Sequence, residues 1–345
     1  MGRKVYIIHT AEVPCRWDLN GEKEQIMLIL IRGAGDIASG IALRLYRAGM
    51  DVVMTEIPHP TSIRRTVCFS EALRKGEEVL VEDAAAAPVK TWPESAEGQS
   101  YPGKDMSASA FIDEIRGILA ERKIAVVEDP DAKVRELLHP DAIVDAILAK
   151  RNLGTKMTDA PVVVAVGPGF TAGKDCHAVV ETKRGHTLGR VIYEGSPIPN
   201  TGIPGNIGGY TVERVLRASA DGIFRTIHEI GDHVEAGEAA AYVETALSRQ
   251  SASDRDTSGI SAVEAEAISE AGERLPVICE ISGVLRGLLP DGTPVTKDMK
   301  SGDVDPRDVM ENCYTASDKA LAVGGGVLEA ILRLSGALRQ SAEKR

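Results

Sequence analysis

Apolar and amphipathic segments alternate along the first half of the chain. An apolar run at residues 28–32 leads into glycine-rich residues 33–40, an amphipathic segment at 41–49 and a second apolar run at 51–56. The alternation continues in four further segments, at residues 111–121, 124–129, 142–148 and 162–170. Strands that alternate with helices predict a mostly parallel sheet covered by helices.

The glycine-rich residues have a spacing typical of a dinucleotide-binding turn. Gly33 and Gly35 lack the Cβ atom that would keep a pyrophosphate away from the backbone amides, and Ala38 is small enough for close helix–strand packing. Glu56 ends the second apolar run about 20 residues further on, where a carboxylate can accept hydrogen bonds from ribose hydroxyls. The pattern therefore predicts a Rossmann-type unit from Leu28 to Glu56.

A different pattern begins near Asp221, where short strand-like runs are separated by turn residues. Residues 231–238 (GDHVEAGE) resemble a turn of the biotinyl/lipoyl-type barrel-sandwich, and residues 281–295 resemble its quasi-repeat. In carrier domains of that type, the hairpin between the two halves presents a modifiable lysine, whereas residues 244–276 contain no lysine. We therefore predict a small all-β domain with a structural or docking role.

These patterns predict an α/β fold class, with a Rossmann-like, mostly parallel sheet and an additional barrel-sandwich-like β-domain. The segments expected are an N-terminal extension without stable structure at 1–26, a nucleotide-binding domain at 27–150, an α/β middle segment at 151–218, the β-domain at 219–300 and a helical segment at 301–345. A stretch dominated by Ser, Ala, Asp and Glu at 248–274 predicts a mobile insertion in the β-domain. The sequence leaves open whether Met27 is the true start.

Composition narrows the class of protein. A net charge of −11 argues against nonspecific nucleic-acid binding, and no apolar run reaches the ~18 residues that a membrane span needs. Five widely spaced cysteines fit a reducing cytoplasm better than a disulfide framework. Cys176 and His177 have no second Cys/His pair at a zinc spacing. We expect a cytoplasmic protein with no metal site and no nucleic-acid or membrane partner.

Residues 167–195 carry most of the remaining candidate chemistry. Gly167 and Gly169 follow a buried strand, so their backbone amides can form a second anion-accepting turn. Four polar residues with acid–base or anion-binding chemistry lie close by, namely Glu181, Arg184, His186 and Arg190. The alternative is a hairpin whose charges are solvated or paired with one another.

Five stretches match the pattern of one family in order. They lie at residues 31–56, 60–73, 166–192, 200–205 and 312–332. The chain thereby resembles, over roughly residues 27–335, the accessory proteins of selenium-dependent molybdenum hydroxylases, which are similar in role to XdhC-type maturation factors. The resemblance implies handling of a molybdenum cofactor, or of its selenium or sulfur ligand, and a hydroxylase subunit as partner.

The leading hypothesis is a maturation factor that binds a molybdopterin-type or nucleotide cofactor. Gly33, Gly35 and Ala38 would form the phosphate turn, and Arg64 and Arg65 would neutralise phosphate. The full set of predicted cofactor-binding residues is Gly33, Gly35, Ala38, Glu56, Arg64, Arg65, Gly167, Gly169, Glu181, Arg184 and His186.

Two alternatives use the same residues differently. The first is an NAD-dependent oxidoreductase that binds NAD at the glycine turn, and the second is a non-catalytic scaffold that docks on a hydroxylase. The sequence identifies no catalytic residue, and it leaves open whether a reaction is catalysed and whether copies of the chain assemble into a homo-oligomer.

Overall fold

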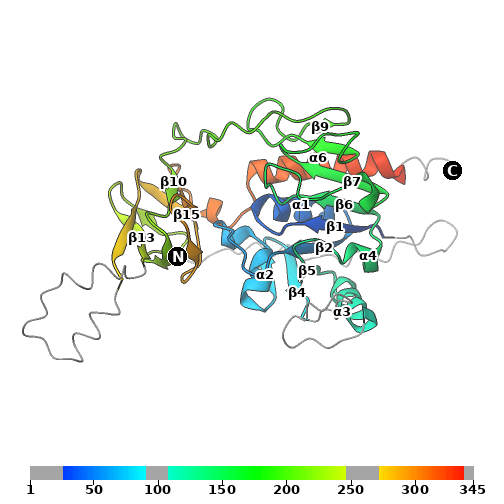
Figure 1. The fold of residues 1–345 in the computed structure, drawn as a ribbon, viewed down its shortest axis with the longest axis horizontal. Helices are drawn as coiled ribbons and strands as arrows, with labels where there is room; N and C mark the ends of the chain where they lie inside the picture. The colour runs from blue at the N-terminus through cyan, green and yellow to red at the C-terminus, as the bar shows by residue number, and fades with distance from the viewer. Residues whose placement is uncertain (1–25, 91–107, 246–271, 338–345) are drawn as a thin grey trace, which may run out of the picture.

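The computed structural model describes residues 26–90, 108–245 and 272–337. Within these ranges the chain forms a nine-stranded sheet with helices on its faces, which we call the sheet domain, and a smaller domain of two four-stranded sheets, the β-domain (Figure 1). The predicted N-terminal extension and nearly all of the predicted mobile insertion lie outside the described residues.

The large sheet is mixed. Its strands are β1 (Leu28–Arg32), β2 (Asp51–Glu56), β3 (Val79–Val81), β4 (Ala84–Pro88), β5 (Ile124–Glu128), β6 (Ala142–Asp145), β7 (Val162–Val166), β8 (Ala178–Val180) and β9 (Val191–Ile192). They lie in the order β3-β4-β5-β2-β1-β6-β7-β8-β9. Every pair from β4 to β8 in that order is parallel, whereas the edge strands β3 and β9 pair antiparallel.

The predicted Rossmann-like fold class is wrong, although the elements around the glycine turn lie where the sequence places them. The turn is flanked by β1 and by helix α1 (Asp36–Arg47), and β2 follows. However, an antiparallel strand forms each edge of the sheet. From β5 to β7 the chain forms only α4 (Arg135–Leu138) and the 3-10 turn η2 (Met157–Asp159), in place of the longer crossover helices of a Rossmann unit.

Side chains of the central strands alternate between two cores. Ile29 and Ile31 of β1 pack in the core beneath α1 and α6 (Asp318–Ser335), whereas Leu30 packs in the core beneath α3 (Ala108–Ala120). This alternation is the two-residue period of a strand that is buried on both faces. The remaining short helical elements are α2 (Ser70–Lys75), η1 (Arg65–Val67) and η3 (Met310–Cys313).

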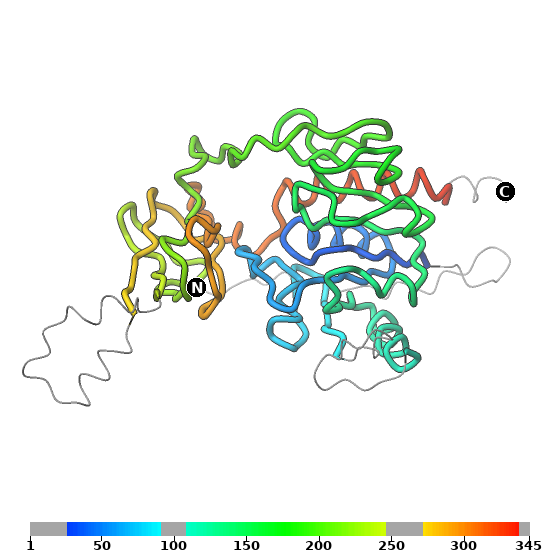
Figure 2. The backbone as a smooth tube through the Cα atoms, viewed as in Figure 1, coloured from blue at the N-terminus to red at the C-terminus, as the bar shows by residue number. Residues whose placement is uncertain are grey.

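Helices α1 and α6 lie against each other although they are far apart in the sequence (Figure 2). A Cβ atom on Gly40 of α1 would lie 2.5 Å from the Cβ of Ala320, and one on Gly324 of α6 would lie 2.9 Å from the carbonyl oxygen of Gly40. Glycine at these two positions therefore lets the helix backbones approach closely. None of the helices in the described ranges is long and apolar enough to cross a membrane.

The β-domain interrupts the sheet domain, because the chain leaves after β9, forms the β-domain and returns as α6 (Figure 1). Its strands are β10 (Val215–Arg217), β11 (Gly222–Thr226), β12 (His233–Val234), β13 (Ala239–Glu244), β14 (Arg274–Ile278), β15 (Gly283–Leu288), β16 (Pro294–Val295) and β17 (Lys300–Asp305). They form two sheets, in the orders β10-β17-β15-β12 and β14-β13-β11-β16, around a core of their own.

The sequence motif at residues 231–238 contains strand β12, and its residues 235–238 form the turn between β12 and β13. The Gly237 amide donates to the carbonyl oxygen of Cys279, and the Glu238 carboxylate accepts from the Glu235 amide. Such a turn specifies a local connection between two strands and does not specify the domain around it. The predicted assignment to a biotinyl/lipoyl-like barrel-sandwich is not supported.

Candidate functional site

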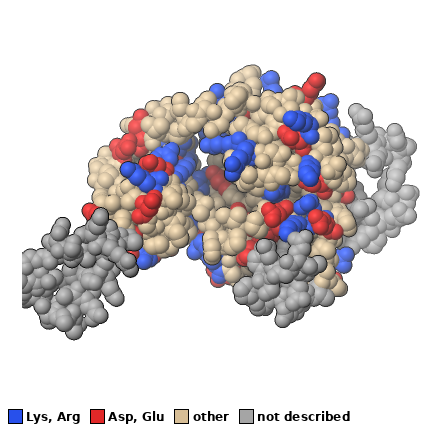
Figure 3. Space-filling view, viewed as in Figure 1, with Lys and Arg blue, Asp and Glu red and all other residues tan. Residues whose placement is uncertain are grey.

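A cleft of about 1000 Å³ lies between the sheet domain and the β-domain, and we call it the central cleft. The N-terminal ends of α1 and α6 and residues 181–185 line it from the sheet domain, and β10, β15 and β17 line it from the β-domain. The loop at residues 198–207 crosses between the two domains. Figure 3 shows Lys and Arg side chains on both sides of the hollow between the domains.

Positive charge dominates the central cleft. Nine Lys and Arg residues line it against three Asp and Glu residues. The nine are Arg64, Lys150, Lys183, Arg184, Arg214, Arg217, Arg286, Lys300 and Lys319, and the three are Asp36, Glu181 and Asp303. Because the whole chain carries a net charge of −11, this surplus of cations is a local property of the cleft. A cavity lined by one sign of charge attracts ligands of the other sign.

Two buried arginines on the β-domain wall share one carboxylate. Arg214 and Arg286 both contact Asp303, and Arg286 Nη1 lies 3.2 Å from Asp305 Oδ2. Burial raises the pKa of Asp305, but hydrogen bonds from Arg307 and the charge of Arg286 outweigh it and leave that pKa below its ordinary value. These guanidinium groups are therefore held by carboxylates of their own domain.

Two arginines on the sheet-domain wall are also paired. Arg64 Nη1 lies 3.1 Å from Asp36 Oδ1, and its Nη2 donates to the carbonyl oxygen of Asn312 at 2.9 Å. Arg184 makes two hydrogen bonds to the Asp318 carboxylate, of 2.6 and 2.9 Å. Arg64 thus fixes the start of α1 to the segment that precedes α6, and Arg184 fixes its own loop to α6.

Four lysines in the cleft, in contrast, form no ion pair with any carboxylate in the described part of the chain. They are Lys150, Lys183, Lys300 and Lys319. Burial lowers the pKa of Lys300, Asp303 partly offsets this, and Arg214 and Arg286 lower the pKa further. Burial also lowers the pKa of Lys319, as does the charge of Arg184. Groups of this kind are common at functional sites.

Glu181 holds the first residue of the loop at residues 198–207 in place. The Glu181 carboxylate is buried and accepts from the backbone amides of Lys183 at 2.7 Å and of Ile198 at 2.8 Å. At the other end of the loop, the Arg214 guanidinium donates to the carbonyl oxygen of Gly205 at 3.2 Å. Both domains therefore position this loop over the cleft.

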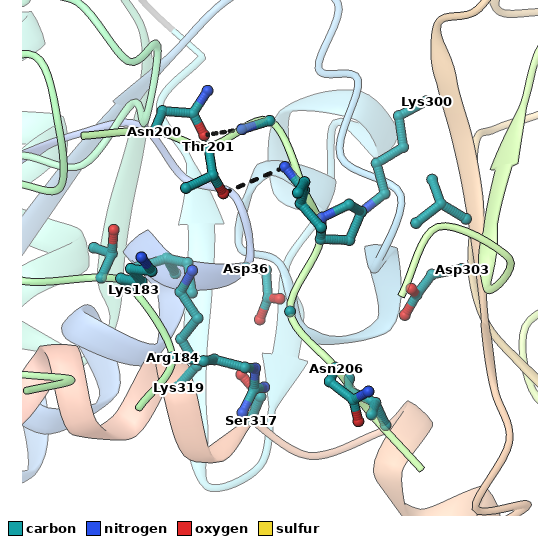
Figure 4. A pocket seen from close by; sticks show the side chains of 18 of the residues that line it. Asp36, Lys183, Arg184, Asn200, Thr201, Asn206, Lys300, Asp303, Ser317 and Lys319 are labelled. Atoms are coloured by element: carbon teal, nitrogen blue, oxygen red, sulfur yellow. Dashed lines mark hydrogen bonds between the residues drawn. The ribbon is translucent and has the colours of Figure 1, made fainter. Parts of the chain in front are cut away.

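Side chains of the same loop add neutral groups to the cleft (Figure 4). Asn200 Oδ1 accepts from the Gly202 amide at 3.3 Å, and this leaves the amide nitrogen of Asn200 as a donor. Ile198 and Ile203 line the cleft and are 40% and 67% exposed. The loop therefore offers apolar surface and hydrogen-bond donors beside the cationic walls.

Only three of the residues predicted as cofactor-binding line the central cleft, namely Arg64, Glu181 and Arg184. The others lie outside its lining: Gly33, Gly35, Ala38, Glu56, Arg65, Gly167, Gly169 and His186. Arg65 donates to the carbonyl oxygen of Leu288 at 2.9 Å and so joins the two domains. His186 is exposed.

The glycine turn after β1 binds a carboxylate of the chain itself. The Ala34 amide donates to Glu56 Oε2 at 2.9 Å, and the Ile57 amide donates to Glu56 Oε1 at 2.9 Å. Burial raises the pKa of Glu56, and these two hydrogen bonds offset only part of that effect. An amide that a pyrophosphate would need at this turn is therefore occupied by Glu56.

Sequence reasoning missed the lysines that most distinguish the cleft. Lys300 begins β17 and Lys319 lies in the first turn of α6, where a lysine normally indicates a solvated position. No local pattern marks either residue, because the charges around them come from other segments. Among residues 26–90, 108–245 and 272–337, no group of three or more His, Cys, Asp or Glu side chains could hold a metal ion.

Comparison with curated proteins finds one relative of unknown role. "Uncharacterized protein YqeB" of Escherichia coli (strain K12) is 44% identical over 307 residues, which is 89% of this chain and 48% of that protein. The chain thus spans about half the length of the curated relative that it matches. No family model matches the chain.

Comparison with solved structures finds proteins of low similarity. An aspartoacylase family protein from Mesorhizobium loti is 11% identical, with 81% of this chain and 85% of that chain covered and a TM-score of 0.22. A succinylglutamate desuccinylase/aspartoacylase from Rhodobacter sphaeroides is 15% identical, with 79% and 86% covered and a TM-score of 0.21. The ectoine utilization protein EutE (DoeB) from Ruegeria pomeroyi is 13% identical, with 81% and 85% covered and a TM-score of 0.22. Scores this low carry no argument about the activity of this chain.

The family and functions predicted from the sequence are corrected by these findings. Two of the solved structures are described as aspartoacylase or desuccinylase family proteins and the third as an ectoine utilization protein, the curated relative is described as uncharacterized, and none is described as a molybdenum hydroxylase accessory protein. Maturation of selenium-dependent molybdenum hydroxylases is therefore wrong as the predicted function. The alternatives, an NAD-dependent oxidoreductase and a hydroxylase-docking scaffold, are not supported either.

Proposed function

We propose that the protein binds a small polyanionic molecule, one that carries phosphate or carboxylate groups, in the central cleft. The observation that carries this proposal is the set of four lysines, Lys150, Lys183, Lys300 and Lys319, that line the cleft without a carboxylate partner in the described ranges. Arg64, Arg184, Arg214 and Arg286 are paired with carboxylates of the protein, and Arg217 donates to the carbonyl oxygen of Asp298. The lysines are therefore the groups most available to bind an anion. Ammonium groups bind phosphate as point charges.

The size and lining of the cleft indicate the kind of molecule. Its volume of about 1000 Å³ is at the upper end of the range of small-molecule sites, which is roughly 300–1000 Å³. Ile198 and Ile203 offer apolar surface that suits a ring or a hydrocarbon body. A nucleotide-sized molecule with several anionic groups fits both properties.

The cofactors expected from the sequence stay predictions within this proposal. Molybdopterin, its dinucleotide and NAD all carry phosphate, so each can be tried as a ligand of the central cleft. A cytoplasmic location, a hydroxylase subunit as partner and assembly into a homo-oligomer likewise stay predictions.

The test is binding of defined anions measured by isothermal titration calorimetry and by thermal shift. We expect pyrophosphate, ATP or citrate to bind, and we expect the affinity to fall as salt rises because the contacts are ionic. At a ligand concentration 100 times the Kd, binding stabilises the folded protein by about 2.7 kcal/mol, which is visible as a higher melting temperature.

A matched pair of triple variants locates the site. Substituting Gln for Lys183, Lys300 and Lys319 should weaken binding by about 100- to 1000-fold, since three lost ionic contacts at roughly tenfold each give about 1000-fold when they are additive. The control replaces three exposed lysines outside the cleft by Gln, and these are Lys133, Lys174 and Lys297. Both variants change the net charge equally. Equal loss of affinity in the two variants, or no binding of any of the three anions to the unchanged protein, would refute the proposal.

A further inference from the structure

Lys300 and Lys319 enter the central cleft from opposite domains. Lys300 is the first residue of β17 in the β-domain, and Lys319 is the second residue of α6 in the sheet domain. Both line the cleft, and neither forms an ion pair with a carboxylate of the described chain. Figure 4 shows both side chains in the view of the cleft, with the Asp36 carboxylate between them.

The two ammonium groups share one electrostatic environment. The positive charge of Lys300 lowers the pKa of Lys319, after burial and the charge of Arg184, and the negative charge of Asp36 raises the pKa of both lysines. Asp36 is already paired with Arg64. Two cations from two domains thus share this environment, and neither forms an ion pair with a carboxylate of the described residues.

The start of α6 adds to the attraction for an anion. The helix has 18 residues, and its N-cap Ser317 accepts a hydrogen bond from the Ala320 amide. The partial positive charge of a helix N-terminus favours an anion at this end. The lysine pair and this helix end face the same cleft.

We infer that Lys300 and Lys319 contact the same anionic group of the ligand, so that a single phosphate or carboxylate joins the β-domain to the sheet domain. This inference rests on the proposed function, since it says how the polyanion is held. The bound group relieves the repulsion between the two lysines. A ligand without an anionic group therefore gains no binding free energy from Lys300 and Lys319.

The experiment is a double-mutant cycle on the binding of pyrophosphate to the full chain. Calorimetry gives the Kd for the unchanged protein, Lys300→Gln, Lys319→Gln and the double variant. Each single change should weaken binding by at least tenfold, and the double variant should be at least fivefold tighter than the product of the two single losses predicts, because residues that share a partner are not additive. A cycle that pairs Lys300→Gln with Lys297→Gln is the control and should be additive.

The outcomes separate this inference from the proposed function. Additive losses at Lys300 and Lys319, within twofold, would overturn the shared contact while leaving the anion site intact. Absence of pyrophosphate binding to the unchanged protein would overturn the inference together with the pyrophosphate arm of the proposed function, and ATP and citrate then decide whether the anion site itself stands. Lys300→Arg keeps the charge, and it should retain binding within about threefold. Melting temperatures without pyrophosphate that are no lower than that of the unchanged protein confirm that the variants fold.

Discussion

Adjacent glycines in α6 offer a sharp test of how the helix is packed. A Cβ atom at Gly326 would lie 2.8 Å from Cγ1 of Val180 and closer still to the carbonyl oxygen of Gly189. A Cβ atom at Gly325 would meet nothing within 4 Å. We therefore expect Gly326→Ala to destabilise the protein and Gly325→Ala to stabilise it.

The magnitude follows from two effects. Replacing Gly by Ala inside a helix favours folding by about 1 kcal/mol through backbone entropy, and this gain is common to both positions. Forcing an extra methyl group into packed surroundings costs about 1–3 kcal/mol, and only Gly326→Ala incurs that cost. The two variants should thus differ in free energy of unfolding by about 1–3 kcal/mol.

The assay is urea denaturation followed by circular dichroism, in which the midpoints are compared at an unchanged slope. A difference of this size also separates the melting temperatures by several degrees, at about 2–4 °C per kcal/mol for a domain of 150–250 residues. If the two variants are equally stable within about 0.5 kcal/mol, the close approach of α6 to Gly189 is refuted.

Three further predictions concern charged groups. Asp303→Asn leaves two buried guanidinium groups without their shared carboxylate. We expect the free energy of unfolding, measured by thermal denaturation, to fall by about 3–5 kcal/mol. The control, Asp298→Asn at an exposed position, should leave the free energy of unfolding unchanged. Burial raises the pKa of Glu56 above its ordinary value of 4.5, so the folded state keeps the proton to a higher pH than the unfolded chain and loses stability as the pH rises from 4.5 through the raised pKa. Glu56→Gln should therefore gain stability relative to the unchanged protein as the pH rises above 4.5, and a constant difference would contradict this. Burial lowers the pKa of Lys300, so the charge of Lys300 opposes folding at every pH below that lowered pKa. Without ligand, Lys300→Gln should therefore have a slightly higher melting temperature than the unchanged protein at pH 7. This difference in melting temperature should disappear as the pH approaches 10.5.

Local elements were predictable from the sequence, and the arrangement of strands was not. The two strands of the unit from Leu28 to Glu56 were predicted at the correct residues, because their signals lie within a few residues of one another. Helix α1 begins at Asp36, five residues before the predicted amphipathic segment at 41–49. The antiparallel edge strands β3 and β9 are three and two residues long, too short for a period-two pattern to reveal. The Rossmann-like assignment failed because neither these edge strands nor the short connections from β5 to β7 leave a clear local signal in the sequence.

The candidate site was predicted only in part, for a related reason. Arg64 and Arg184 were predicted as anion ligands and do line the cleft, but their guanidinium groups are paired with Asp36 and Asp318. Asp318 lies 134 positions beyond Arg184, so no local pattern links the two. Lys319 follows Asp318 and forms no ion pair with a carboxylate of the described residues, but its sequence context predicts an ordinary solvated helix residue.

The close packing of α6 on α1 has a consequence for the order in which the protein acquires its structure. During synthesis, α1 is made early. The surface around Gly40 stays uncovered until Ala320, almost 300 positions later, has been synthesised. The β-domain has its own core and can fold during that interval. The sheet domain is then completed last, by the arrival of α6. Apolar surface that is exposed for such a period during folding is prone to aggregation, and α6 removes that hazard when it packs on α1.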